Sequence, residues 1–240
     1  MNFTITRQNL HNGLASVSAS IPSKTTLPVL SNILFEAENG NVWMSGTDLD
    51  VAVRIKVPAD VREEGSLTAP GKKLQEIAKE LPDQPVEINT IGRQIQLKSG
   101  RGHFKLNGLP SDEFPTMPEV GFEDGWSVTG KDVSQLIHHT SFAVSNEESR
   151  PILNGVLWEL REGAMRMVAT NGHRLARMKV PAESGDASSA DFIVPPGALQ
   201  QVQRLFKKDD VLEAVSYTHL IAHETRHDVV CRLLLEKKMG

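Results

Sequence analysis

The chain repeats itself. Residues 27–36, LPVLSNILFE, align without a gap with residues 150–159, RPILNGVLWE, at a shift of 123 positions. The same shift pairs other residues along the sequence, among them Gly40 with Gly163, Thr47 with Thr170 and Val57-Pro58 with Val180-Pro181. Further along, the shift increases by two residues, a two-residue slip that aligns Ala69-Pro70 with Val194-Pro195. Because prolines, a glycine and a threonine recur together with apolar positions, we infer that the chain contains two copies of one domain.

Two amphipathic helices are predicted in the first copy. The first carries apolar or small residues at i, i+3, i+4 and i+7, a spacing that places them on one face: Leu10, Gly13, Leu14 and Val17. The second copy repeats this pattern at Val133, Leu136, Ile137 and Thr140. The second helix opens at Pro70, since proline suits a first helical turn. Its buried side is expected to hold Leu74, Ile77, Ala78 and Leu81.

Short segments between and after these helices favour strands. Alternation of apolar and polar residues is clearest over Val51–Val57. The full set of expected strands in the first copy is Asn32–Ala37, Val42–Ser45, Val51–Val57, Val86–Thr90, Ile95–Lys98 and His103–Leu106. We therefore predict an α+β fold, with tandem copies of a domain in which two helices pack on a mostly antiparallel sheet, and with the second copy incomplete.

The predicted domain organisation follows the repeat. The first copy occupies residues 1–120, and Leu109–Gly125, rich in Pro, Gly and acids, is interpreted as a linker. The second copy, at 126–215, is expected to be truncated, because the repeat fades there. Residues 216–240 have a different composition, with the only Tyr, the only Cys and three of the eight His. We predict that this tail is not native and resembles translated sequencing-adapter DNA; a divergent C-terminal helix is the alternative.

Composition excludes several classes of protein. The 240 residues are 39% hydrophobic and 23% charged, which is typical of a globular protein and not of a disordered one. The sequence contains no apolar run of about 18 residues, the length that spans a bilayer. One cysteine cannot form an internal disulfide, so a cytoplasmic location is expected. A net charge of −4 excludes binding of nucleic acid through bulk positive charge, although a locally basic face remains open.

Several short motifs point to a known family. They are Thr26–Leu30, Gly46–Leu49, Leu109-Pro110 with Phe114-Pro115, and Ala169–Ala176, where the family usually has Asp in place of Asn171. With these motifs in order, residues 1–215 resemble the β sliding clamp of bacterial DNA polymerase III. The resemblance implies a ring-shaped processivity factor that encircles duplex DNA and tethers the replicative polymerase. In that family two subunits of three domains each close a homodimeric ring, so we expect the third domain to be missing from this sequence.

The resemblance also implies two kinds of site. Clamps bind short linear peptides of the polymerase, the clamp loader and repair proteins in a cleft between their second and third domains. The second-domain wall maps onto Leu153, Thr170, Gly172, His173, Arg174 and Leu175. Sequence-independent contact with double-stranded DNA is expected at basic residues in or near the helices that line the hole: Lys24, Arg150, Lys72 and Lys73.

Other functions were weighed against this one. His223-Glu224-Thr225-Arg226-His227 matches the H-E-x-x-H pattern of zinc peptidases, but only 13 residues follow it, too few for the usual third ligand. A two-domain clamp that forms a trimeric ring is a second alternative, and a small-ligand enzyme with His173 as the base is a third. No catalytic motif stands out, so we expect no cofactor, no metal and no enzymatic activity. The chain alone is expected to bind peptides weakly and to form no closed ring.

Overall fold

The structure is a computed structural model that describes residues 1–22, 24–116, 126–147, 149–161, 163–184, 189–218 and 231–237. The chain divides into two compact units, Met1–Pro118 and Glu119–Gly240. Their boundary lies inside the segment that the sequence predicted as a linker.

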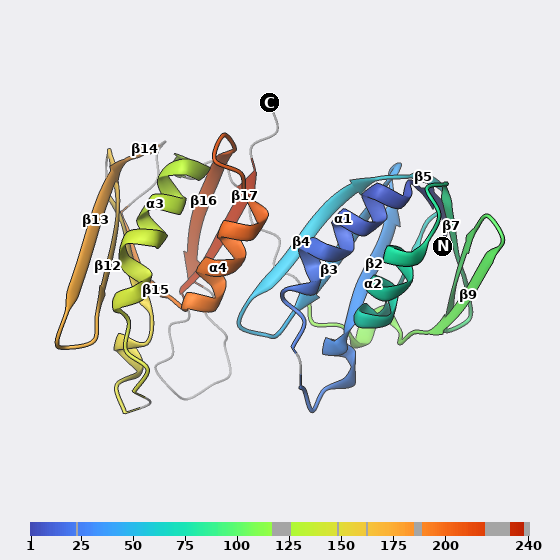
Figure 1. Ribbon diagram of the computed structural model, residues 1–240, viewed down its shortest axis with the longest axis horizontal. Coiled ribbons are helices and arrows are strands. Elements are labelled where there is room, and N and C mark those ends of the chain that lie inside the picture. Colours follow the sequence, from blue (N-terminus) through green and yellow to red (C-terminus); the bar gives the residue numbers. More distant parts are fainter. Residues whose placement is uncertain are drawn as a thin grey trace. The chain divides into compact units, whose positions relative to one another are not determined.

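The first unit contains two antiparallel sheets and two helices (Figure 1). One sheet has the order β5-β1-β7-β8-β9, with β5 Asp60–Glu63, β1 Asn2–Ile5, β7 Val86–Ile91, β8 Gln94–Ser99 and β9 Gly102–Asn107. The other has the order β4-β3-β2-β6, with β4 Ala52–Pro58, β3 Asn41–Thr47, β2 Asn32–Glu38 and β6 Gly65–Pro70. The helices α1, Arg7–Ser18, and α2, Gly71–Glu80, lie side by side, and two short 3₁₀ helices are η1, Pro28–Ser31, and η2, Ser111–Glu113.

The second unit repeats this arrangement. One sheet has the order β14-β10-β16-β17, with β14 Glu183–Ser184, β10 Trp126–Thr129, β16 Val211–Thr218 and β17 Cys231–Lys237. The other has the order β13-β12-β11-β15, with β13 Leu175–Pro181, β12 Ala164–Thr170, β11 Val156–Arg161 and β15 Ala190–Val194. The helices are α3, Gly130–Thr140, and α4, Pro196–Leu205, with the 3₁₀ helices η3, Ser141–Ala143, and η4, Pro151–Leu153.

Most elements of the first unit have a counterpart in the second, as the repeat predicts. Strands β3 and β12 begin at residues 41 and 164, which are 123 apart, and helices α2 and α4 begin at 71 and 196, which are 125 apart. The two-residue slip therefore lies between these elements, where the sequence placed it. The α+β fold and the tandem copies are confirmed. The strands of each unit form two sheets, a division that the sequence pattern did not reveal.

The repeat becomes irregular toward the end of the chain. Strand β16 begins 125 residues after β7, and the same shift places the counterpart of β8 at residues 219–224, which lie outside the described residues. Strand β17 starts instead at Cys231 and pairs antiparallel with β16. Among the described residues, β9 has no counterpart. The sheet thus continues past residue 215, and the non-native origin of residues 216–240 stays a prediction.

Both first helices begin with the same cap. The hydroxyl of Thr6 accepts a hydrogen bond from the Asn9 N–H at 3.1 Å, and the hydroxyl of Thr129 accepts one from the Asp132 N–H at 3.1 Å. Each threonine thereby satisfies a backbone donor that the first helical turn leaves free. All eight residues that were predicted for the buried faces of α1 and α3 are buried.

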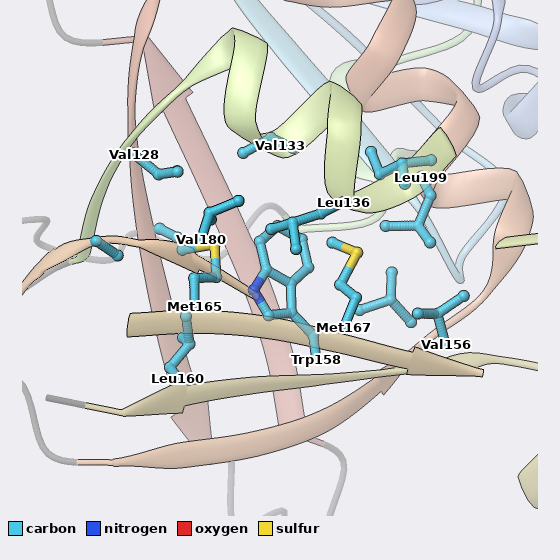
Figure 2. Packing of buried hydrophobic residues seen from close by; sticks show 14 of the residues in the cluster. Val128, Val133, Leu136, Val156, Trp158, Leu160, Met165, Met167, Val180 and Leu199 are labelled. Atoms are coloured by element: carbon cyan, nitrogen blue, oxygen red, sulfur yellow. The ribbon is translucent and has the colours of Figure 1, made fainter. Parts of the chain in front are cut away.

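The core of the second unit forms around Trp158, which is fully buried (Figure 2). This residue lies on β11 opposite Met167 of β12 and Phe192 of β15, and helix α3 covers it with Leu136. The Trp158 and Phe192 rings are 5.8 Å apart. Burial of such a large apolar surface is the main contribution that holds the helices on the sheet.

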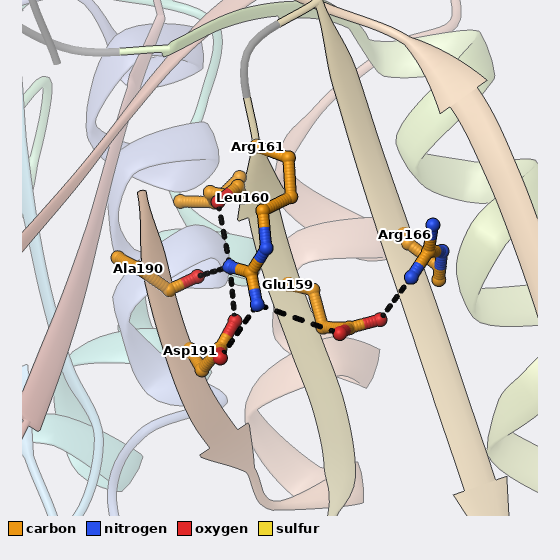
Figure 3. Close-up of polar contacts among 6 residues, drawn as sticks. All are labelled: Glu159, Leu160, Arg161, Arg166, Ala190 and Asp191. Carbon is orange, nitrogen blue, oxygen red and sulfur yellow. Dashed lines mark hydrogen bonds and ion pairs between the residues drawn. The ribbon is translucent and has the colours of Figure 1, made fainter. Parts of the chain in front are cut away.

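On the exposed face of this sheet a charged network spans three strands (Figure 3). Arg161 donates two hydrogen bonds to the Asp191 carboxylate, one of them at 2.7 Å, and its Nη2 is 3.6 Å from Glu159 Oε1. Arg166 donates to the other oxygen of Glu159 at 3.0 Å. Glu159 and Asp191 are direct cross-strand neighbours, so the two arginines offset a repulsion between like charges.

This network predicts a pH-dependent contribution to stability. The hydrogen bonds and charge of Arg161 hold the pKa of Asp191 below its ordinary value. Because the folded pKa is the lower one, the contribution is present above about pH 4, the unfolded pKa, and is lost as the pH falls through the folded pKa. We expect Asp191→Asn to lower the free energy of unfolding measured with urea at pH 7, and the deficit to shrink toward pH 3. Asp83→Asn, on an exposed residue, is the control; a deficit that grows toward pH 3 would contradict the assignment.

Candidate functional site

The candidate peptide residues of the second unit lie in and beside the turn that joins β12 to β13. The Thr170 hydroxyl, at the end of β12, accepts a hydrogen bond from the Gly172 N–H at 3.1 Å and donates one to the Arg174 carbonyl at 2.8 Å. Gly172 has a φ of +89°, a left-handed conformation that glycine adopts without steric cost. One hydroxyl and one glycine therefore fix this side of the turn.

Asn171 closes the turn from the other side. Its Oδ1 accepts from the N–H groups of His173, at 3.1 Å, and of Arg174, at 3.0 Å. An aspartate oxygen accepts the same two bonds, which explains why Asn can stand where the resemblance expects Asp. With the backbone fixed in this way, the His173 and Arg174 side chains and Leu175 at the start of β13 are exposed.

Leu153 approaches this turn from η4. Its N–H donates to the Arg150 carbonyl at 3.0 Å, and its own carbonyl accepts from the Ser145 N–H at 2.8 Å. A side-chain carbon on Gly172 would stand 3.4 Å from the Arg150 guanidinium. The structure therefore brings Arg150, together with the short helix that carries Leu153, up to the turn. All six predicted peptide residues lie in these two segments.

Two exposed apolar residues beside the turn were missed by the sequence analysis. Phe142 of η3 is 57% exposed and Ile152 of η4 is 70% exposed, values close to the 68% of Leu175. The Arg174 guanidinium donates to the Phe142 carbonyl and lies 5.6 Å from the centre of its ring. Phe142 comes just after the apolar stripe of α3. A large apolar residue outside that stripe has no predicted place in the core, and this was the sign in the sequence that it could be exposed. The segments around the turn thus combine apolar side chains with the cationic groups of Arg150 and Arg174.

The predicted DNA contacts fall on both units. Lys72 and Lys73 are exposed in the first turn of α2, and Lys24 is exposed in the loop that follows α1. Ile21, just before that loop, packs against Gly71, so these three lysines lie toward the same end of the helix pair in the first unit. Arg150 is exposed in the second unit, but its Nε is 3.9 Å from the Glu147 carboxylate, so its charge is partly neutralised.

A metal site was sought in the part of the chain that the structure describes. There, no group of three His, Cys, Asp or Glu side chains is placed to hold an ion. The H-E-x-x-H sequence at 223–227 lies outside the described residues. Likewise, no helix in the described part is long and apolar enough to cross a membrane.

Comparison with known proteins gives consistent matches on both units. The family model for the N-terminal domain of the DNA polymerase III beta subunit matches residues 1–118, and the model for its central domain matches residues 127–237. The second match runs through the H-E-x-x-H sequence. Together the two matches include 118 and 111 residues, or 229 of the 240.

Individual relatives agree. The chain is 36% identical to a beta sliding clamp of Pseudomonas aeruginosa over 212 residues, 88% of this chain and 58% of that protein. A solved clamp of the same organism, bound to griselimycin, superimposes with a TM-score of 0.83 at 36% identity, over 90% of this chain and 59% of the other. A Bacillus subtilis sliding clamp has a TM-score of 0.86 at 28% identity, over 91% and 60%. The chain therefore spans less than two thirds of the length of these relatives.

The double hydrogen bond to Asn171 predicts how the turn responds to substitution. We expect Asn171→Ala to lower the free energy of unfolding by about 1–2 kcal/mol, because two backbone N–H groups lose their acceptor. Asn171→Asp keeps the acceptor oxygen and is the matched control, with a change under about 0.5 kcal/mol. Urea denaturation followed by circular dichroism measures both. Equal losses in the two variants would show that the side-chain oxygen does not hold the turn.

Proposed function

This chain belongs to the family of DNA polymerase III beta subunits, and we propose that it supplies the first two domains of a sliding clamp, which encircles duplex DNA and tethers the replicative polymerase. The observation that carries the proposal is the order of the matches: the N-terminal and central family models fall one on each of the two repeated units. A repeated domain is the natural building block of a closed ring. The complete ring, in this proposal, is a homodimer of longer subunits.

In this proposal the second unit carries one wall of the peptide pocket, formed by Leu153, Thr170, Gly172, His173, Arg174 and Leu175. The exposed side chain of Leu175 and the half-buried Leu153 offer apolar surface, and Gly172 lets a peptide backbone approach closely. The Arg174 guanidinium can donate to carbonyl or carboxylate groups of the peptide. The partners are short linear motifs of the polymerase, the clamp loader and repair proteins. Phe142 and Ile152 extend this apolar surface.

We assign sequence-independent contact with DNA to Lys24, Lys72, Lys73 and Arg150. Flexible lysines suit a sliding contact, since they reach phosphates without reading base edges. The three lysines toward one end of the first helix pair support the assignment better than Arg150, because the Arg150 guanidinium already forms an ion pair with Glu147. The clamp is proposed to have no catalytic activity of its own, because the candidate surface combines apolar and cationic groups without a paired base and nucleophile. A cytoplasmic location accords with the single cysteine.

The proposed peptide wall predicts binding of griselimycin, the compound bound in the Pseudomonas aeruginosa clamp. We expect griselimycin to shift the methyl NMR signals of Leu153 and Leu175. Leu175→Ser should weaken its affinity about tenfold, because an apolar side chain is removed from the contact. Ile91→Ser, on an exposed residue of the first unit, is the control and should leave the affinity unchanged. Binding that is unaffected by Leu175→Ser would remove this residue from the site.

The proposed DNA contacts predict a salt dependence. In a titration with duplex DNA, the double variant Lys72→Gln/Lys73→Gln should reduce the slope of log affinity against log salt by about 1.8, the contribution of two phosphate contacts. Lys105→Gln, on the edge strand β9, is the control and should keep the slope. An unchanged slope in the double variant would place the DNA elsewhere on the molecule.

A further inference from the structure

The first unit has a hollow of about 490 Å³ at the place that corresponds to the peptide wall of the second unit. It is lined by Pro22, Lys24, Thr25 and Thr26 of the loop after α1, by Leu27 and Leu30, and by the turn residues Asp48 and Leu49. At the shift of 123, Leu30 corresponds to Leu153 in the second unit. The leucines of this hollow belong to the motifs Thr26–Leu30 and Gly46–Leu49, to which neither the peptide wall nor the DNA contacts assign a role.

The turn beside the hollow is built like the one in the second unit. The Thr47 hydroxyl accepts from the Leu49 N–H at 3.0 Å. Asp48 Oδ1 accepts from the N–H groups of Asp50, at 3.1 Å, and Val51, at 2.7 Å. These are the bonds that Thr170 and Asn171 make in the other unit. The same scaffold thus presents different side chains.

Leu49 is held in a costly conformation. Its φ is +82°, in the left-handed region, where the second unit has Gly172 at +89°. A side chain raises the energy of this conformation, and glycine avoids that cost. Burial does not repay the cost in the first unit, because Leu49 is 56% exposed. Strain kept at an exposed apolar side chain points to a contact with another molecule.

Two further leucines contribute apolar surface to the hollow, Leu27 and Leu30. Leu27, at the rim, is 49% exposed. Leu30, at the floor, is 3% exposed and packs with Val29, Leu34 and Phe114 in a small cluster of its own. Because Phe114 comes from the segment after β9, the chain itself supports the floor from below. Leu27 and Leu49 are therefore free to contact a ligand while Leu30 stays fixed.

The charged residues at the rim restrict which ligand can bind in the hollow. The Lys24 ammonium lines the hollow and makes no ion pair with any described residue. The Asp48 carboxylate also lines it, but one of its oxygens already accepts two backbone N–H groups. A ligand that fits therefore has apolar side chains for the leucines and a carboxylate within reach of Lys24.

We propose that this hollow is a second peptide site, which binds an extended segment of a partner protein with leucine-type side chains and an acidic residue beside them. The choice of a peptide rests on the proposed function, because the site repeats the scaffold of the peptide wall in the second unit. The two sites differ in chemistry. Leu27 corresponds to Arg150 and Leu49 to Gly172, so at these two positions the first unit presents leucines where the second presents an arginine and a glycine, and it selects a different set of segments.

The test uses the tripeptide acetyl-Leu-Glu-Leu-amide and the chain with methyl-labelled leucine. In an extended tripeptide the two leucines share one side, so both can enter the hollow, while the glutamate faces outward, where the exposed Lys24 side chain is the available cation. We expect saturable shifts of the Leu27, Leu30 and Leu49 methyl signals. Leu49→Gly should weaken binding about tenfold, since a buried leucine contact is lost. It should leave the thermal midpoint equal or higher, since glycine relieves the strain.

Controls separate this site from the one in the second unit. Leu27→Ser should also weaken tripeptide binding, whereas Leu175→Ser should not. Acetyl-Leu-Gln-Leu-amide, which lacks the carboxylate, should bind several-fold more weakly to the native chain. If the three methyl signals stay in place at 10 mM tripeptide, or if Leu49→Gly binds it equally well, the proposal is wrong. Shifts of these signals by duplex DNA and not by the tripeptide would also overturn it. The griselimycin titration reports on Leu153 and Leu175 separately, so the proposed function can fail or hold on its own.

Discussion

The contact of one capped helix with one sheet is the constraint on which each unit depends. Helices α1 and α3 start at equivalent threonines and bury equivalent stripes on β3–β4 and β12–β13. Within the stripe, Gly13 of the first unit corresponds to Leu136 of the second. Met44 fills the space beside Gly13, because a side-chain carbon there would come within 2.8 Å of the Met44 sulfur. The fold thus accommodates glycine and leucine at equivalent positions, although the neighbouring methionine, Met44 or Met167, is the same in both units.

The same scaffold carries different surfaces. In both units a threonine hydroxyl and an Asp or Asn oxygen hold the hairpin turn, so its backbone geometry is insensitive to the residues that it displays. The displayed residues differ between the units: the first has the strained Leu49, and the second has Gly172 beside Arg150. A duplicated domain can in this way keep its fold and acquire two binding surfaces of distinct chemistry.

Much of this fold could be predicted from the sequence, because the helices and the long strands bury one face and their apolar residues recur with the matching period. Strand β1, Asn2–Ile5, was missed although it alternates, since four residues make a weak pattern. Strand β5, Asp60–Glu63, is polar and leaves no pattern to detect. The turn residues 170–175 were predicted by resemblance, whereas Phe142 was not, because its exposure depends on how η3 leaves helix α3.

A crystal structure of the chain tests the central claim of a duplicated clamp domain most directly. The account predicts that β1–β7 with both helices superimposes on β10–β16 strand for strand, with Thr6 on Thr129 at the helix caps and Asp48 on Asn171 in the turns. A second unit with another strand order, or with its first helix on the opposite face of the sheet, would contradict it.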